Sequence, residues 1–257
     1  MTGYLVLVFR FGYGCGIRGS IDSPYPYPYP YPDPMSRHLL TIIALLCFTP
    51  MVFAETLAPQ KILFVGNSIT KHGPKADIDW HGNWGMAATS EEKDYVHLVT
   101  KALAAKQGAM PEIMIKNVAD FERNHVGYDI TGKFADAAAF KADLIILCIG
   151  ENVAALKTPE TQAKYQEQVT ALLKTLKSNP QAAVIVRSSF WANEAKDTAM
   201  RKACEAVGGT FVDISTLSKD EQNYARSERP YKHAGVANHP GDRGMAAIAE
   251  AIVKAVK

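Results

Sequence analysis

The feature that most constrains the fold is a regular alternation between short apolar runs and longer segments of helical periodicity. Five runs rich in Val, Ile, Leu and Phe follow one another from Lys61 onward. They cover residues 61–65, 112–118, 143–149, 182–189 and 210–214. Strands that alternate with helices in this way pair in parallel, with helices on both faces. The sequence therefore predicts an α/β fold, a three-layer α/β/α sandwich around a five-stranded parallel sheet.

The segments between these runs carry helix signals. Thr158 is expected to cap a helix that has Pro159 in its first turn, and the apolar residues that follow lie on one helical face. We expect another helix to be entered through residues 90–92 and to close at Gly108. A last amphipathic helix is expected over residues 243–256.

Residues 1–34 differ from the rest of the chain. They include the repeat PYPYPYPYPDP at residues 24–34. Proline removes backbone donors and favours polyproline II, so this repeat cannot build a packed core. We interpret residues 1–34 as a non-structural extension that results from an over-extended gene start.

Residues 35–54 have the layout of a secretory signal peptide. Met35 is followed by a short basic region, an apolar run and Ala54 at the expected cleavage position. The uninterrupted apolar part, residues 39–48, is too short to span a bilayer. We therefore expect an exported protein, periplasmic or secreted, with a single domain over residues 55–257 and no membrane anchor after cleavage.

Charge and motifs exclude several function classes. The 257 residues carry 28 Lys and Arg against 26 Asp and Glu, a net charge of +2, which argues against a strongly basic nucleic-acid binder. Residues 55–257 hold no Walker loop and no GxGxxG motif, and their histidines lack metal-ligand spacing. We expect no cofactor and no metal. Cys148 and Cys204 are expected to be buried free thiols rather than a disulfide.

Three polar segments stand where strands end or a helix begins. Ser68 follows the first apolar run, Asn152 follows the third, and His239 precedes the last helix. A lone serine after a strand is more often a turn or cap residue than a nucleophile. However, the carboxyl ends of parallel strands form the usual ligand-binding edge of such a sheet. A histidine beside a serine hydroxyl at that edge can activate it as a nucleophile.

The connection over residues 66–90 is far longer than the usual strand-to-helix loop. It contains Trp80, His81 and Trp84, and we expect it to form a substrate-facing wall. Trp191 follows the fourth run and is a third candidate. For each tryptophan, core packing and stacking against a sugar are equally good explanations.

The chain resembles the SGNH hydrolases, a branch of the GDSL esterases and lipases, over nearly all of residues 60–256. The resemblance rests on GNSIT at residues 66–70, GEN at 150–152 and HPGDRGM at 239–245. It implies that Ser68 is the nucleophile and His239 the base. It also implies an oxyanion hole made from Ser68, Asn152, Gly150 and Ala119.

Two positions depart from the pattern of that family. The glycine of its second block is replaced by Ala119, whose backbone N–H can still donate. The aspartate that usually lies three residues before the histidine is replaced by Val236. We prefer a dyad of Ser68 and His239 whose imidazole is oriented by a backbone carbonyl or a remote carboxylate. The acids considered for that role are Glu151, Asp120, Glu122 and Asp242, and we expect Asp242 to act mainly as an N-cap.

These features together predict an exported serine esterase that acts on a small acyl ester. An O-acetylated carbohydrate is the expected substrate, as for the carbohydrate esterases among SGNH proteins. A lipase or thioesterase of the same family is an alternative, which a long apolar groove would favour. A glycan-binding or assembly protein that lost turnover is another alternative, because Val236 stands at the aspartate position.

Overall fold

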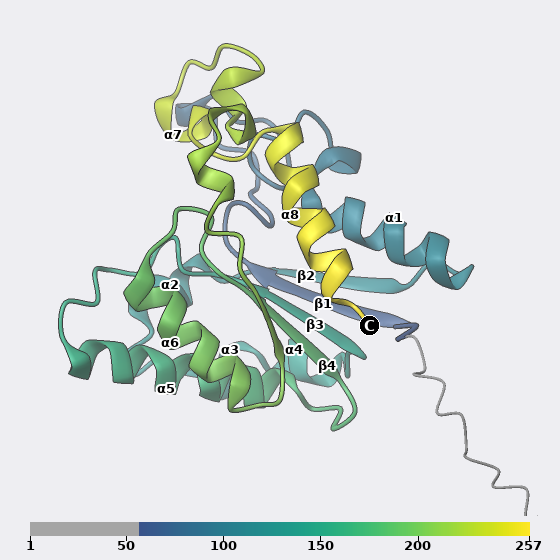
Figure 1. Ribbon diagram of the computed structural model, residues 1–257, viewed down its shortest axis with the longest axis vertical. Helices are drawn as coiled ribbons and strands as arrows, with labels where there is room; N and C mark the ends of the chain where they lie inside the picture. The colour runs from purple at the N-terminus through teal and green to yellow at the C-terminus, as the bar shows by residue number, and fades with distance from the viewer. Residues whose placement is uncertain (1–56) are drawn as a thin grey trace, which may run out of the picture. The chain divides into compact units, whose positions relative to one another are not determined.

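The computed structural model describes residues 57–257, so the predicted extension and signal peptide lie outside the described residues. Its centre is a five-stranded parallel sheet of order β2-β1-β3-β4-β5 (Figure 1). The strands are β1 (Lys61–Gly66), β2 (Glu112–Asn117), β3 (Leu144–Cys148), β4 (Ala183–Arg187) and β5 (Thr210–Val212). The predicted fold class is confirmed; β2 to β5 fall within their expected runs, and β1 extends one residue beyond its run, to Gly66.

Helices cover both faces of the sheet (Figure 1). One face packs against α1 (Tyr95–Gln107) and α8 (Asp242–Ala255). The other packs against α2 (Ala119–Asn124), α3 (Ile130–Lys133), α4 (Ala135–Ala139), α5 (Pro159–Leu176) and α6 (Glu194–Glu205). The remaining elements are α7 (Ala234–Ala237) and 3₁₀ turns at Ala76–Ile78, Glu91–Lys93, Leu217–Lys219, Glu221–Asn223 and Ala225–Ser227.

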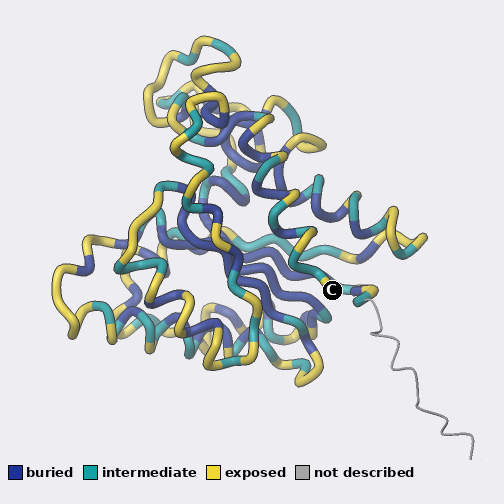
Figure 2. Tube along the Cα trace, viewed as in Figure 1, coloured by how far each residue is buried: buried dark blue, intermediate teal, exposed yellow. Residues whose placement is uncertain are grey.

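Burial on both faces explains why the strands are apolar without interruption. Successive side chains of a strand point to opposite faces. Ile62 and Phe64 accordingly join the core beneath α1 and α8, whereas Leu63 and Val65 join the core on the other face. In Figure 2 the central strands are buried along their length, while the helices are buried on one side only. None of the helices between residues 57 and 257 is both long and apolar enough to cross a membrane.

The two cysteines of the described chain are buried and free, as expected. Cys148 belongs to the core beneath α1 and α8, and Cys204 belongs to the core on the opposite face of the sheet. The sheet therefore separates the two thiols.

The helix ends agree only in part with the sequence prediction. Thr158 and Thr161 form a reciprocal capping box at the start of α5, with Pro159 as its first residue, and Gly108 ends α1 with a φ of 75°. However, α1 is not entered through residues 90–92. It begins at Tyr95 and is capped by the buried Asp94, which accepts from the His97 N–H and also from the Gly85 N–H. Asp94 thus holds the end of the long loop against α1.

The prediction that Asp242 caps the last helix is wrong. Gly241 occupies the cap position, and the Glu228 carboxylate accepts from the N–H groups of Asp242 and Arg243. Asp242 is the first helical residue, and its own carboxylate accepts from the Thr89 N–H and hydroxyl and contacts Lys93. The cap comes from a residue 14 positions away, which a local pattern does not reveal.

Gly66, the last residue of β1, has no room for a side chain. A Cβ atom there would collide with the Thr70 side chain and lie 2.7 Å from the Cys148 carbonyl oxygen. The close approach of β1 to the end of β3 thus requires glycine at this position. Ser68 follows two residues later.

We predict that Gly66→Ala lowers the free energy of unfolding by about 1–3 kcal/mol, because the added methyl group overpacks a rigid backbone contact. Urea denaturation followed by circular dichroism measures the change. Gly73→Ala is the control, since its Cβ would meet only the Asn83 Oδ1 atom, at 3.9 Å. Equal stability of the two variants would contradict the prediction.

Candidate active site

Ser68 and His239 meet at the carboxyl edge of the sheet. Ser68 lies in the turn after β1, and His239 lies between α7 and α8. The Ser68 Oγ and His239 Nε2 atoms are 2.8 Å apart, although 171 positions separate the residues in the chain. The other ring nitrogen, Nδ1, lies 2.7 Å from the Gly235 carbonyl oxygen. Because a carbonyl only accepts, Nδ1 carries the proton and Nε2 is left to accept from the serine hydroxyl.

A backbone carbonyl, rather than a carboxylate, orients the imidazole. Gly235 belongs to α7, and the carbonyls of a final helical turn have no partner within the helix. The structure brings none of Glu151, Asp120 or Asp242 into hydrogen bonding with His239, which corrects that part of the sequence interpretation. Asp120 bonds Tyr128 and Asn124, whereas Glu151 bonds Arg187, Asn67 and the Phe190 N–H.

The imidazole is sheltered from solvent. Burial lowers the pKa of His239 below its ordinary value of 6.5, and the hydrogen bond to Gly235 and the charge of Glu151 oppose this only in part. Trp191 packs edge-to-face against the imidazole with ring centroids 5.7 Å apart, so the structure places this predicted substrate contact against the base itself. His239 is therefore neutral at neutral pH and suited to accept a proton.

The Asn152 amide is held at both ends by consecutive residues of α2. Its Nδ2 donates to the Glu122 Oε2 atom at 2.7 Å, and its Oδ1 accepts from the Arg123 Nη2 at 3.3 Å. These two contacts determine which end of the amide is the donor. Asn152 lines the same cavity as Ser68, and the second hydrogen on Nδ2 remains for a ligand.

The other expected oxyanion donors are engaged elsewhere. The Gly150 N–H donates to the Glu122 Oε1 at 2.6 Å and does not line the cavity, so its assignment to the oxyanion hole is wrong. Ala119 lines the cavity, but its N–H donates to the Asn117 Oδ1 at 3.0 Å. Within residues 57–257 the Ser68 N–H has no hydrogen-bond acceptor. Of the expected oxyanion donors, the Ser68 N–H and the Asn152 side chain are thus the two that remain available.

Two buried carboxylates support these residues from below. Burial and the charge of Glu151 raise the pKa of Glu122. Burial also disfavours the charged form of Glu151, but the Arg187 guanidinium 2.7 Å away outweighs this and holds the pKa of Glu151 below its ordinary value. Sequence reasoning missed Arg187, although a lone charged residue in the fourth apolar run was a signal for it.

Asn67 joins the two carboxylates. Its Nδ2 lies 3.3 Å from the Glu122 Oε1 and 2.6 Å from the Glu151 Oε2, while its Oδ1 accepts from the Ile69 N–H. Asn67 stands where the GDSL pattern often has aspartate. An amide fits here because both neighbours are acceptors, and an aspartate would add a third carboxylate to a buried site.

Ser68 and His239 open onto a cavity of about 410 Å³. Three segments form most of the wall of this cavity: the long loop, the end of β2 with α2, and the loop after β3. The stretch around α7 completes the wall. The lining residues are Ser68, His72, Lys75, Ile78, Met86, Asn117, Ala119, Arg123, Asn152, His233, Gly235, Val236 and His239.

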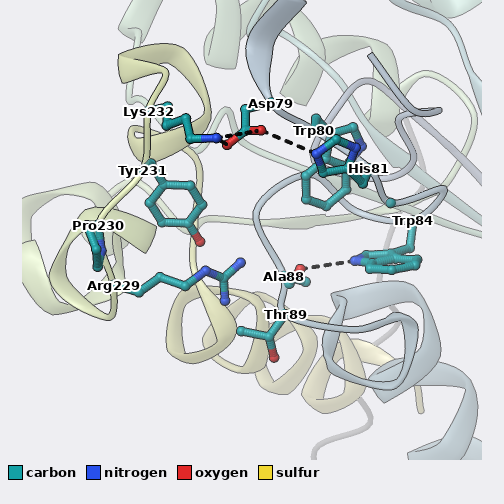
Figure 3. A pocket seen from close by; sticks show the side chains of 11 residues that line it. Asp79, Trp80, His81, Trp84, Ala88, Thr89, Arg229, Pro230, Tyr231 and Lys232 are labelled. Atoms are coloured by element: carbon teal, nitrogen blue, oxygen red, sulfur yellow. Dashed lines mark hydrogen bonds and ion pairs between the residues drawn. The ribbon is translucent and has the colours of Figure 1, made fainter. Parts of the chain in front are cut away.

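Trp80 and Trp84 line a second cavity, of about 560 Å³, rather than the one that holds Ser68 (Figure 3). Arg229, Tyr231 and Lys232 lie across this second cavity from the tryptophans (Figure 3). The expectation for the long loop is therefore correct only in part. Its residues His72, Lys75, Ile78 and Met86 form a wall of the Ser68 cavity, but its two tryptophans do not.

The second cavity shares a wall with the first. Trp80 is 5% exposed and packs with Met86 and Val236, which line the Ser68 cavity. Its indole N–H donates to the His72 carbonyl oxygen. Trp80 thus has a packing role on one side and faces the second cavity on the other. Between residues 57 and 257, no group of three His, Cys, Asp or Glu side chains is placed to hold a metal ion.

Comparison with known proteins places this geometry in context. The family model described as the GDSL-like Lipase/Acylhydrolase family matches residues 64–247. The crystal structure of the lipase/acylhydrolase from Enterococcus faecalis is 16% identical, with a TM-score of 0.50, and the match covers 76% of this chain and 94% of that one.

A family two carbohydrate esterase from Cellvibrio japonicus is 20% identical, with a TM-score of 0.46, over 77% of this chain and 61% of that one. At such identities the likeness concerns the fold. Comparison with curated proteins finds no match.

The environment of Asn67 generates a prediction for stability. We expect Asn67→Asp to lower the free energy of unfolding by about 3–5 kcal/mol at pH 8, because it buries an unpaired charge beside two carboxylates. Those carboxylates raise the pKa of the new aspartate above its unfolded value, so the loss shrinks as the pH falls and the group becomes protonated.

Denaturant unfolding at pH 8 and pH 5 measures this effect. Asn67→Ala is the control, because it removes the same hydrogen bonds without adding a charge. A stability loss in Asn67→Asp with no more pH dependence than in Asn67→Ala would contradict the prediction.

Proposed function

Since the chain belongs to the GDSL-like lipase/acylhydrolase family, we propose that this hydrolase is an exported serine esterase that removes small acyl groups, above all O-acetyl, from carbohydrate. The observation that carries the proposal is the 2.8 Å contact between the Ser68 Oγ and a His239 Nε2 that is left as the acceptor. A free serine is a poor nucleophile, and an adjacent neutral imidazole is the group that activates it.

In the proposed reaction the Ser68 Oγ attacks the ester carbonyl carbon while His239 Nε2 takes the hydroxyl proton. The carbonyl oxygen becomes an oxyanion that accepts from the Ser68 N–H and the Asn152 Nδ2. The C–O bond to the alcohol then breaks, and His239 returns the proton to the leaving alcohol. Water, deprotonated by the same imidazole, then attacks the acyl carbon. The bond between that carbon and the Ser68 Oγ breaks, the imidazolium returns the proton to the Oγ, and the carboxylic acid is released.

Gly235 supplies orientation but no counter-charge in this scheme. The Nδ1–H···O=C bond fixes the tautomer and the plane of the ring, which is one task of the aspartate in a complete triad. A neutral carbonyl stabilises the imidazolium less than a carboxylate does. The buried Glu151 supplies a supporting negative charge, which favours the protonated form of His239 without a hydrogen bond to it.

The lining of the Ser68 cavity favours a small acyl group on a polar alcohol. Its apolar side chains are few, chiefly Ile78, Met86 and Val236, and the other walls are largely polar or basic. A lipase or acyl thioesterase would need a longer apolar surface to bind the acyl chain of its substrate. The neighbouring cavity of Trp80, Trp84 and Tyr231 combines aromatic and polar groups, which suits the further extent of a glycan. Export rests on the predicted signal peptide over residues 35–54.

The direct test is hydrolysis of 4-nitrophenyl acetate and of the corresponding octanoate. We expect turnover that favours the acetate, and we expect Ser68→Ala to reduce it by about 10⁴-fold or more, to the background rate, because the nucleophile is lost. Ser178→Ala, an exposed serine at the opposite edge of the sheet, is the matched control. Full activity of Ser68→Ala would refute the proposal, and absence of turnover with intact glycan binding would favour the binding-protein alternative.

The burial of His239 predicts the pH profile. His239 must be neutral to accept the proton, and its lowered pKa keeps it neutral below the ordinary histidine range, so kcat/KM should rise with pH through a midpoint below 6.5. Trp191→Ala should expose the ring and move the midpoint upward, because burial is the main cause of the lowered pKa. The measurement is kcat/KM of the acetate from pH 4 to 8.

Asp120→Asn is the control for this profile, since Asp120 makes no contact with the imidazole. Its midpoint should match that of the parent protein. A parent midpoint above 6.5 would contradict the dominant effect of burial. A shift in Asp120→Asn as large as in Trp191→Ala would show that Asp120 acts on the imidazole and would argue against orientation by Gly235 alone.

A further inference from the structure

We propose that the alcohol part of the substrate carries a carboxylate and that Arg123 binds it, an inference that rests on the proposed esterase function. The substrate class would then be an O-acylated acidic sugar rather than a neutral one. The argument starts from the charges around the Ser68 cavity.

The lining of this cavity is basic. His72, Lys75, Arg123 and His233 contribute to it, and none of its lining residues is Asp or Glu. The buried Glu122 is occupied by the Gly150 and Asn152 N–H groups and by two side-chain amides, and Glu151 is paired with Arg187. A ligand in the cavity therefore meets positive charge directly, while the acids below are already bound.

Arg123 is the cation best placed to bind such a ligand. Within residues 57–257 its guanidinium is in no ion pair, and its hydrogen bond to the Asn152 Oδ1 at 3.3 Å uses one of five N–H donors. The other arginines of the described chain are engaged differently. Arg229 stacks on a tyrosine ring. The four other arginines each contact a carboxylate; they are Arg187, Arg201, Arg226 and Arg243. Lys75 is less available, because the Asp77 carboxylate lies 3.5 Å from its Nζ.

The position of Arg123 determines where the anion must be. Its contact with Asn152 places the guanidinium beside the donor that faces the ester carbonyl in the proposed reaction. A small acyl group such as acetyl has no further substituent, so a charged group within reach of Arg123 belongs to the alcohol. The planar fork of a guanidinium matches a carboxylate with two parallel hydrogen bonds. Uronic acids carry such a carboxylate on the sugar ring.

Matched aryl acetates test the proposal. The probes are 3- and 4-acetoxybenzoate against the corresponding acetoxybenzamides, with each kcat/KM divided by the rate of hydroxide hydrolysis of the same ester. We expect at least one benzoate to be preferred by about tenfold or more at low salt, and the preference to shrink at high ionic strength. The measurement uses the full protein.

Variants separate charge recognition from the positioning of Asn152. Arg123→Gln removes the charge and should abolish the preference for the benzoate, whereas Arg123→Lys keeps the charge and should retain part of it. Both variants also alter the support of Asn152 and so lower kcat on all esters, which is why the ratio between benzoate and benzamide is the readout. Arg201→Gln is the control: Arg201 lies in α6 and does not line the Ser68 cavity, so this variant should leave the ratio unchanged.

The outcomes are distinct. Hydrolysis of both esters without preference would overturn the proposal, and so would an equal loss of kcat/KM on both esters in Arg123→Gln. Either result would leave the esterase function intact, and Arg123 would then only position Asn152. If neither ester is hydrolysed in a Ser68-dependent manner, the proposed function itself fails, and the inference fails with it.

Discussion

A buried ion pair between Arg187 and Glu151 lies beneath the candidate active site. The two side chains are 0% and 4% exposed and 2.7 Å apart, and they join the end of β4 to the loop after β3. Removing charges from water is costly, so the pair is stable only with further hydrogen bonds. Asn67 and the Phe190 N–H supply these to Glu151. Through Asn67 the pair also fixes the turn after β1, and thereby the position of Ser68.

Glu122 extends this network to the oxyanion donor. Its carboxylate accepts from the Gly150 N–H, the Asn152 N–H and the Asn152 side chain, so α2 and the loop after β3 are held as one unit. Burial and the charge of Glu151 disfavour the charged form of Glu122 and raise its pKa. Because Glu122 binds one hydrogen of the Asn152 amide, the other is held in place as a defined donor that faces the cavity. A preorganised donor of this kind needs no rearrangement when charge develops on a substrate oxygen.

The histidine side of the site is built from backbone contacts. The His239 carbonyl accepts from the Ala225 N–H, Pro240 pairs with Tyr224, and the Gly235 carbonyl binds the ring. Glu228 caps α8, and Asp242 binds the long loop that carries a wall of the cavity. The same segments that hold His239 therefore also hold the cavity wall. This arrangement explains how the imidazole keeps a fixed orientation with Val236 at the position of the usual acid.

The sequence by itself determined the sheet, the start of α5, the end of α1 and the three segments that meet at the carboxyl edge of the sheet. These features follow from local periodicity, from turn and cap residues and from the rule that parallel strands end together. Tertiary structure alone decided the group that orients His239, the roles of Glu122, Arg187 and Glu228, and the cavity to which Trp80 and Trp84 belong. Each of these features depends on a contact between segments that are distant in the chain. Some also depend on which hydrogen-bond donors and acceptors are already occupied by a neighbouring residue. Residue types and spacing do not encode such contacts, because hydrogen-bond partners are chosen only when the folded segments come together.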